Sequence, residues 1–237
     1  MIMKWFGSLL LLLLCASAGA QHLTFEEWSK RMLQDIRLRP RYGDAPKNAA
    51  QQESDAEFVR TVLATDSTPR AASKHLLDLG FQLLREGDFT HSMYRFNQAY
   101  LIDASNTDVY WGFGSFFMEL DKPDLAHTMY RAGLSLDSTN ANLLNGEATA
   151  YLAERAALAP ADSAQADELA EKALRMAQRA VSHDAMHTGA WQRVVICRIA
   201  LGRCKEAMAS FKQYELVAGR TEDTMRIGEL VTKCKGR

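Results

Sequence analysis

The sequence predicts an all-α protein, an α-solenoid of about four helix-turn-helix repeats. One pattern of residues occurs twice between positions 72 and 140, with its copies 34 positions apart. The matched pairs are Gly80 and Gly114, Phe96 and Tyr130, Ala99 and Gly133, Asp103 and Asp137, and Asn106 and Asn140. A fixed period of this length, with small residues where helices cross, is typical of stacked helix pairs that share one core. The chain has only 5 prolines and no alternating β-branched run, which also favours helix over sheet.

Composition places the chain among soluble globular proteins and gives no sign of a nucleic-acid partner. Its 237 residues are 47% hydrophobic and 24% charged, which is enough to bury a core. The formal net charge is −1. Nucleic-acid binding needs a basic patch that neutralises phosphates, so we expect no nucleic-acid partner.

Residues 1–20 have the three parts of an export signal. Lys4 supplies the positive start, residues 9–14 the apolar core, and Ala18-Gly19-Ala20 a small-residue cleavage site. The apolar run is shorter than the roughly 20 residues that a transmembrane helix needs. We therefore expect cleavage after Ala20 and an exported, periplasmic or envelope-associated protein without a membrane span.

A lipoprotein signal is the alternative interpretation of the same segment. Cys15 would then become the lipidated first residue of the mature chain. Such signals usually place a small residue before the cysteine, whereas Leu14 stands there, so the sequence favours cleavage after Ala20.

Residues 21–68 are expected to form an N-terminal helical cap and a linker. Thr24 and Glu27 have the spacing of a capping box, which predicts a helix from Phe25 to Arg37. Residues 40–54 are rich in Pro, Asn, Ala and Gln and are interpreted as a linker or long loop. A second helix is expected from Asp55 to Ala64. Together the two helices would cover the exposed end of the first repeat.

The repeat domain is predicted over residues 69–237. The expected units are residues 73–106, 107–140, 141–187 with an insertion at 153–165, 188–221, and a capping helix at 222–235. Small residues at Gly80, Gly114 and Ala148 would let the helices of each pair approach closely. Phe96, Tyr130 and Phe211 would fill the space between one repeat and the next.

These features make the chain resemble the tetratricopeptide repeat family over about residues 69–235. The motif residues are Leu79, Gly80, Leu83, Phe96 and Ala99, then Phe113, Gly114, Phe117, Ala126 and Tyr130. Residues 93–99 and 109–114 are also similar to a subgroup of exported bacterial repeat proteins. The resemblance implies a superhelix whose first helices line a concave groove that binds a peptide or protein. The lysine, asparagine and arginine clamp of chaperone-binding members is absent, because Leu77 and Phe81 occupy its positions.

The resemblance also implies which residues line the groove. They are Lys74, Leu77, Phe81, Leu84, Asp108, Trp111, Ser115, Met118, Asn142, Asn145 and Gln192. One end is aromatic and apolar and the middle is rich in amides, which suits a bound peptide. Alternatively, Phe25 and Trp28 of the N-terminal helix would themselves fill the apolar end.

No catalytic, metal or cofactor site is predicted. Gly112-Phe113-Gly114 lacks the lysine and the preceding strand of a phosphate-binding loop. His183 and His187 have no further ligands to complete a metal site. We therefore expect no cofactor and a non-enzymatic scaffold that binds a protein or peptide partner. The alternative is a structural assembly factor or accessory subunit of an envelope complex, acting through its convex face and termini.

Three cysteines remain after cleavage at Ala20. Cys204, between the helices of the fourth repeat, and Cys234, near the end of the last helix, would lie at one edge and could form a disulfide in an oxidising compartment. A fully reduced chain is the alternative, because a disulfide requires closely spaced Cα atoms. Cys197 is expected to be buried and free.

The cleavage site leads to a direct prediction. N-terminal sequencing of the exported protein is expected to begin at Gln21. A mature chain that instead starts with a lipid-modified Cys15 would contradict this expectation.

Overall fold

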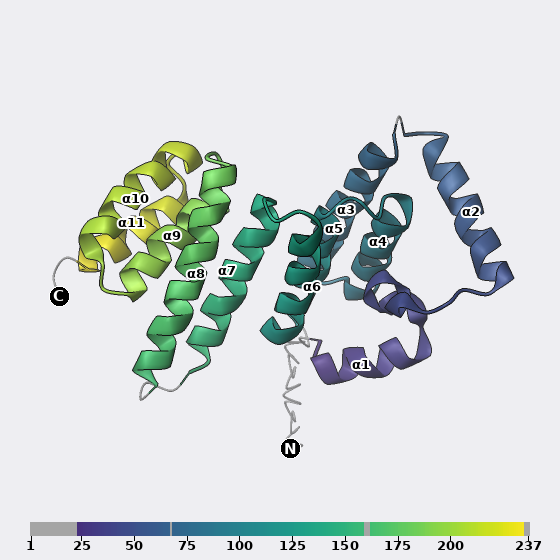
Figure 1. Cartoon of the computed structure of the whole chain (residues 1–237), viewed down its shortest axis with the longest axis horizontal. Helices are drawn as coiled ribbons and strands as arrows, with labels where there is room; N and C mark the ends of the chain where they lie inside the picture. The colour runs from purple at the N-terminus through teal and green to yellow at the C-terminus, as the bar shows by residue number, and fades with distance from the viewer. Residues whose placement is uncertain (1–22, 67, 159–161, 235–237) are drawn as a thin grey trace, which may run out of the picture.

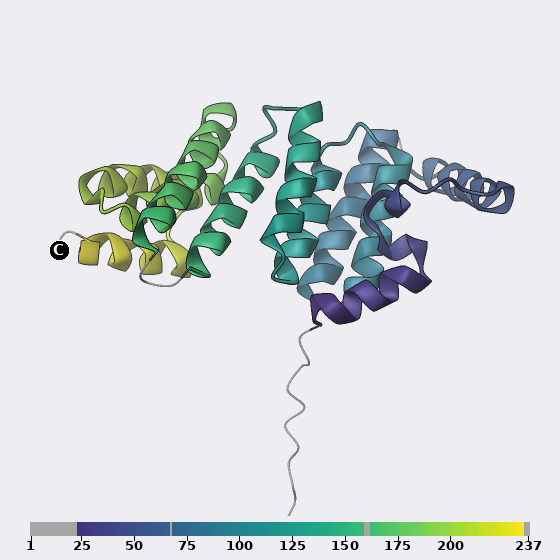
Figure 2. The same ribbon diagram turned by 60° about the horizontal axis from the view of Figure 1, so that its bottom comes forward.

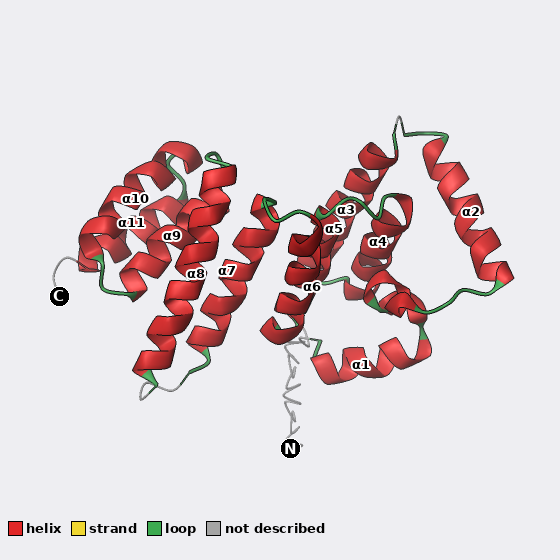
Figure 3. Ribbon diagram, viewed as in Figure 1, coloured by secondary structure: helices red, strands yellow, loops and turns green. Residues whose placement is uncertain are grey.

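The computed structural model describes residues 23–66, 68–158 and 162–234, so the predicted signal peptide and Cys15 lie outside the described residues. Within these ranges the chain forms eleven α-helices and two short 3-10 helices, and it has no strand (Figure 3). The predicted all-α solenoid is confirmed. Among the described helices, none combines the length and the apolar character that crossing a membrane requires.

Four helix pairs stand side by side along the molecule and form the solenoid (Figure 1). The pairs are α3 (Pro69–Arg85) with α4 (Phe89–Ile102), α5 (Asp108–Glu119) with α6 (Pro123–Leu136), α7 (Ala141–Ala156) with α8 (Ser163–His183), and α9 (Thr188–Ala200) with α10 (Cys204–Ala218). Each first helix contacts the next first helix, and each second helix contacts the first helix that follows it. We call the surface of α3, α5, α7 and α9 the first-helix face.

Aromatic rings on the second helices lie between glycines of two successive first helices. A Cβ atom at Gly80 would come within 2.5 Å of the Phe96 ring, and one at Gly112 within 2.9 Å of the same ring. The Tyr130 ring is placed in the same way, at 2.1 Å from a Cβ built on Gly114 and 2.7 Å from one on Gly146. The glycines therefore make room for rings that join each repeat to the next.

The extra residues expected at 153–165 partly lengthen the two helices of the third repeat. Helix α7 continues through Ala156 and α8 begins at Ser163, so parts of the predicted insertion at 153–165 belong to the two helices. The alanine-rich sequence explains why these residues extend the helices, because alanine has the highest helix propensity. Ala148, Ala173 and Ala177 are fully buried between the two helices, where they allow close packing.

Helix α1 (Phe25–Gln34) begins at the predicted capping box but ends three residues early. The Thr24 N–H donates to Glu27 Oε2 at 3.0 Å, and the Glu27 N–H donates to Thr24 Oγ1 at 3.3 Å. The helix stops before the predicted Arg37 because the Asp35 carboxylate accepts bonds from the Arg37 N–H and guanidinium. The 3-10 helices η1 (Ile36–Leu38) and η2 (Pro40–Asp44) follow.

Helix α2 (Ala49–Leu63) corrects the predicted linker at residues 40–54. It begins six residues before the expected Asp55, because Asn48 and Gln51 form a second capping box. Helix α2 contacts α3 and α4 but has no fully buried residue. In Figures 1 and 2 it stands at the end of the molecule, apart from the closely packed pairs.

Residues 35–47, which we call the strap, pack on α4 through polar contacts. The buried Asn97 donates from Nδ2 to the carbonyl oxygens of Arg37 at 2.8 Å and Arg39 at 2.9 Å. Its Oδ1 accepts from the Tyr42 N–H at 3.4 Å. One buried amide side chain therefore satisfies three backbone groups of the strap.

A buried ionic cluster joins α6 to α7. His127 Nδ1 lies 2.7 Å from Glu147 Oε2, and Arg131 Nε donates to Glu147 Oε1 at 3.0 Å. Only 4% of His127 and 3% of Glu147 is exposed. No local sequence pattern connects His127 to Glu147, because the two residues lie on successive helices and meet only in the folded chain.

The C-terminal helix α11 (Glu222–Cys234) covers the last pair. Ile227 and Val231 are buried in one cluster with Val195 of α9 and Tyr214 of α10. Cys204 and Cys234 form a disulfide with a Cα–Cα distance of 5.5 Å across a sequence separation of 30.

The remaining described cysteine, Cys197, is buried and free. Burial raises the pKa of its thiol to about 12, so this thiol is unreactive at neutral pH.

The glycine contacts predict a large effect from one methyl group. Gly114→Ala is expected to lower the free energy of unfolding by about 1–3 kcal/mol, because the new Cβ would lie 2.1 Å from the Tyr130 ring. Urea unfolding of the single and double variants with Tyr130→Leu would measure the coupling. Additive effects, with a coupling below about 0.5 kcal/mol, would show that the ring and the glycine do not compete for space.

The disulfide predicts a stabilised C-terminal end. Replacing Cys204 and Cys234 with serine is expected to lower the free energy of unfolding by about 3–4 kcal/mol, from loss of the cross-link in the unfolded chain. Thiol alkylation followed by mass measurement should label neither residue before reduction and both after it. Labelling of Cys204 in the unreduced, denatured protein would contradict the bridge.

Candidate functional site

All eleven predicted groove residues lie on first helices, but two of them are buried. Leu77 is 3% and Leu84 7% exposed, and Leu77 packs toward Gly112 of the neighbouring first helix. Both residues therefore belong to the core and cannot contact a partner on the surface. This corrects their predicted role, which followed from their position in the repeat without knowledge of how each helix is rotated.

Phe81 of α3 and Trp111 of α5 form a partly exposed aromatic pair on the first-helix face. Their ring centroids are 4.3 Å apart, and the Phe81 ring also packs edge-on against Phe96 at 5.3 Å. Met118 is also partly buried against the same core, whereas Lys74 is exposed and pairs with Asp78. The apolar end of the predicted groove is thus an aromatic surface supported by the core.

The aromatic residues of α1 pack elsewhere. Trp28 is fully buried against Phe116, at 4.7 Å between centroids, and Phe25 packs against Phe117 at 6.4 Å. Lys122, in the turn between α5 and α6, lies over the Phe25 ring. Helix α1 therefore covers the end of α5 near this turn, and the alternative interpretation, in which α1 fills the apolar end at Phe81 and Trp111, is wrong.

A chain of hydrogen bonds links α5, α7 and α9 across the polar part of the face. Asp108 Oδ1 accepts from Nδ2 of Asn140 at 2.8 Å and of Asn142 at 3.1 Å. Asn142 Oδ1 in turn lies 3.2 Å from Nε2 of His187. These bonds orient Asn142, so its amide is a fixed part of the face.

His187 caps α9 and has no metal partner among the described residues. Its Nδ1 accepts a hydrogen bond from the Ala190 N–H at 3.1 Å, so the proton is on Nε2, which donates to Asn142. Burial lowers the pKa of His187 and keeps the ring neutral at pH 7. In the described chain, no three His, Cys, Asp or Glu residues are grouped as metal ligands.

Arg193 of α9 is a functional candidate that the sequence interpretation missed. Its Nε donates to Thr149 Oγ1 of α7 at 3.0 Å, and one terminal nitrogen donates to Gln192 Oε1 at 2.6 Å. No described carboxylate forms an ion pair with it, and burial lowers the pKa of the guanidinium. The only signal in the sequence was an arginine directly before the apolar run of residues 194–197 on a first helix.

Asn145 adds an unsatisfied acceptor to the polar part of the face. Its Oδ1 is buried and has no hydrogen-bond partner in the described chain. A Cβ atom on Gly189 would lie 3.3 Å from its Nδ2, so α9 holds the amide closely. A buried carbonyl oxygen without a donor is unfavourable.

Comparison with known proteins gives a fold but no close relative. No family model and no curated protein matches the sequence. The crystal structure of TTC0263, a thermophilic TPR protein in Thermus thermophilus, is similar with a TM-score of 0.56 and 18% identity, covering 68% of this chain and 80% of that chain. The crystal structure of MamA protein is similar with a TM-score of 0.50 and 16% identity, covering 69% and 82% of the two chains.

Proposed function

Because the chain has the tetratricopeptide repeat fold, we propose that it is a non-enzymatic scaffold that binds a peptide or protein partner through the first-helix face. The proposal depends on one observation above all. The Phe81 and Trp111 rings form a pair that the core supports and that α1 leaves partly exposed. Paired aromatic residues of this kind often dominate the free energy of protein–protein binding.

The polar part of the face supports a peptide as the bound partner. Asn142 and Asn145 place partly exposed amide side chains on α7, and hydrogen bonds to Asp108 and His187 orient that of Asn142. A peptide main chain has regularly spaced N–H and C=O groups that can bond such amides. We place an apolar side chain of the partner at Phe81 and Trp111 and its main chain along α7.

Arg193 extends the proposal to an acidic residue of the partner. Elsewhere in the described chain, the buried Glu147 pairs with Arg131, and Arg70 pairs with Asp103 at 2.7 Å. Arg193 has only neutral partners, Thr149 and Gln192, which hold the guanidinium in place. A carboxylate of the partner would complete the missing ion pair in a partly desolvated site.

The alternative, an assembly factor that acts through its convex face and termini, has less support. The strap already covers part of this surface, because it packs on the second helix α4. A partner on the convex face would have to bind elsewhere. The first-helix face needs no rearrangement to become accessible.

We also propose that the protein is exported and acts in the periplasm or at the bacterial envelope. Two features support this location: the signal-like residues 1–20 and the disulfide between Cys204 and Cys234, since disulfides persist in oxidising compartments. The nature of the N-terminus would follow from the sequencing experiment described above.

The binding proposal predicts selective loss of the partner. Replacing Phe81 and Trp111 with alanine removes the central aromatic contact. The amount of partner recovered by crosslinking and affinity purification from the envelope should then fall at least about tenfold. Arg193→Gln should lower the recovered amount by a similar factor, because the proposed carboxylate of the partner would lose its guanidinium.

Two matched variants serve as controls. Leu216→Ala removes an apolar side chain that is 77% exposed on the second helix α10, and Arg175→Gln removes an exposed charge on α8. Both should retain the partner, and circular dichroism should show unchanged helix content for all variants. A partner that survives the aromatic substitutions but is lost in the α8 or α10 variants would place binding on the convex face instead.

A further inference from the structure

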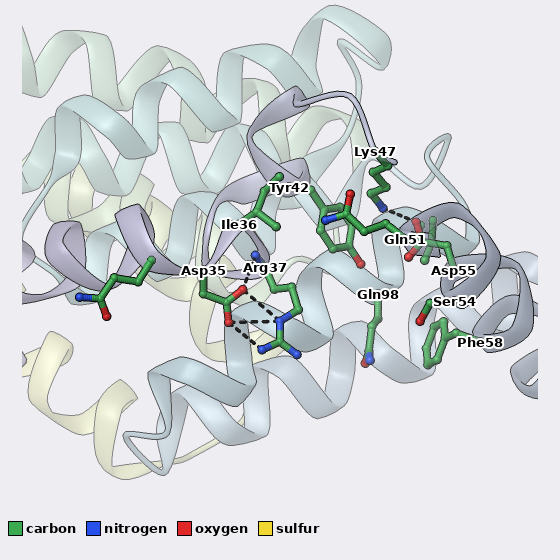
Figure 4. A pocket seen from close by; sticks show the side chains of 12 residues that line it. Asp35, Ile36, Arg37, Tyr42, Lys47, Gln51, Ser54, Asp55, Phe58 and Gln98 are labelled. Carbon is green, nitrogen blue, oxygen red and sulfur yellow. Dashed lines mark hydrogen bonds and ion pairs between the residues drawn. The ribbon is translucent and has the colours of Figure 1, made fainter. Parts of the chain in front are cut away.

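We propose that the pocket between the strap, α2 and α4 binds a small uncharged saccharide. We call this the strap pocket. Figure 4 shows its lining side chains, which include Arg37 and Tyr42 from the strap, Ser54 and Phe58 from α2, and Gln98 from α4. The site is separate from the first-helix face, so it would act independently of the proposed peptide binding.

The pocket has the size and shape of a small-ligand site. It encloses about 450 Å³, within the range of roughly 300–1,000 Å³ that is usual for pockets that bind small molecules. Helix α2 forms one wall and is attached to the solenoid mainly through Phe58, Val59, Val62 and Leu63, which are only partly buried. The N-terminal half of α2 consequently stands away from α4 and leaves the pocket open to solvent.

The charges of the pocket are neutralised within it. Asp35 accepts three bonds from the Arg37 side chain, the shortest at 2.8 Å, and Lys47 pairs with Asp55 (Figure 4). The Arg37 guanidinium lowers the pKa of Asp35 to about 2, so this pair stays ionised across the physiological range. A charged ligand would have to compete with one of these pairs, whereas an uncharged ligand would not.

Several hydrogen-bonding groups of the pocket remain without a partner in the described chain. The amide oxygens of Gln51 and Gln98 accept bonds from Asn48 and Arg95, which leaves both amide nitrogens as donors. The Ser54 hydroxyl is also without a partner among the described residues. Hydroxyl groups both donate and accept, so a sugar ring can use these groups together.

Apolar side chains give the pocket a second surface. Ile36, Phe58 and Leu101 line it beside the polar groups. A saccharide ring has polar hydroxyls at its edge and C–H groups on its faces, so it matches a pocket that combines both surfaces. A purely apolar ligand would leave the glutamine and serine groups unsatisfied.

The backbone beside the pocket is held in an unusual conformation. Arg41, Tyr42 and Asp44 have φ values of 54°, 57° and 52°, in the left-handed region that residues other than glycine seldom adopt. Asn97 and the contact of Lys47 with the Tyr42 ring, 3.6 Å from Nζ to the centroid, hold this turn in place. Strained turns persist where surrounding contacts fix them and are frequent at ligand sites, and this turn positions Tyr42 on the pocket wall.

Three sugars that share one ring would test the charge argument. Isothermal titration and saturation-transfer NMR on the purified protein should detect N-acetylglucosamine with a Kd on the order of 1 mM. Glucosamine, which is cationic, and glucuronate, which is anionic, should bind at least about tenfold more weakly. Equal binding of the charged sugars, or no detectable N-acetylglucosamine binding, would overturn the proposal.

Variants on the two sides of α2 would locate the binding. Ser54→Trp fills the pocket and should abolish binding, whereas Glu53→Trp adds the same bulk at an exposed neighbour that does not line it and should bind normally. Gln98→Ala, on α4, should weaken binding at least several-fold without changing α2. Unchanged binding in both Ser54→Trp and Gln98→Ala would place the sugar elsewhere and refute the strap pocket.

Discussion

The arrangement of the repeats depends on contacts between glycines and aromatic rings. Phe96 and Tyr130 each lie between a glycine of their own repeat and a glycine of the next first helix. One ring therefore determines both the spacing within a pair and the spacing between pairs. The same contacts fix α3 relative to α5. Phe81 of α3 and Trp111 of α5 are therefore held next to each other.

The N-terminal segment is attached by two different kinds of contact. Trp28 is buried among aromatic residues at the end of α5, whereas the strap is held on α4 by the amide of Asn97. The apolar contact buries Trp28 at the end of α5 near the turn to α6. The polar contact holds a strained turn beside α2. This turn places Tyr42 on the wall of the strap pocket.

Two charged groups, Glu147 at the contact of α6 with α7 and Arg193 at the contact of α7 with α9, have different kinds of partner. Between α6 and α7, Glu147 is surrounded by His127 and Arg131, so its burial is compensated. Between α7 and α9, Arg193 has hydrogen bonds but no carboxylate partner in the described chain. The first cluster pairs its buried charges internally, whereas the Arg193 guanidinium is held by neutral hydrogen-bond partners.

The sequence by itself determined the helical pairs, because period, capping and helix propensity act over a few residues. Thr24 and Glu27 predicted the start of α1, and the spacing of Gly80 and Gly114 predicted the repeats. Local patterns failed where a distant partner decided the outcome. Only the tertiary structure buried Leu77, placed Trp28 on Phe116 and left Arg193 without a carboxylate, since each depends on helices that are separate in sequence and meet only when the chain is folded.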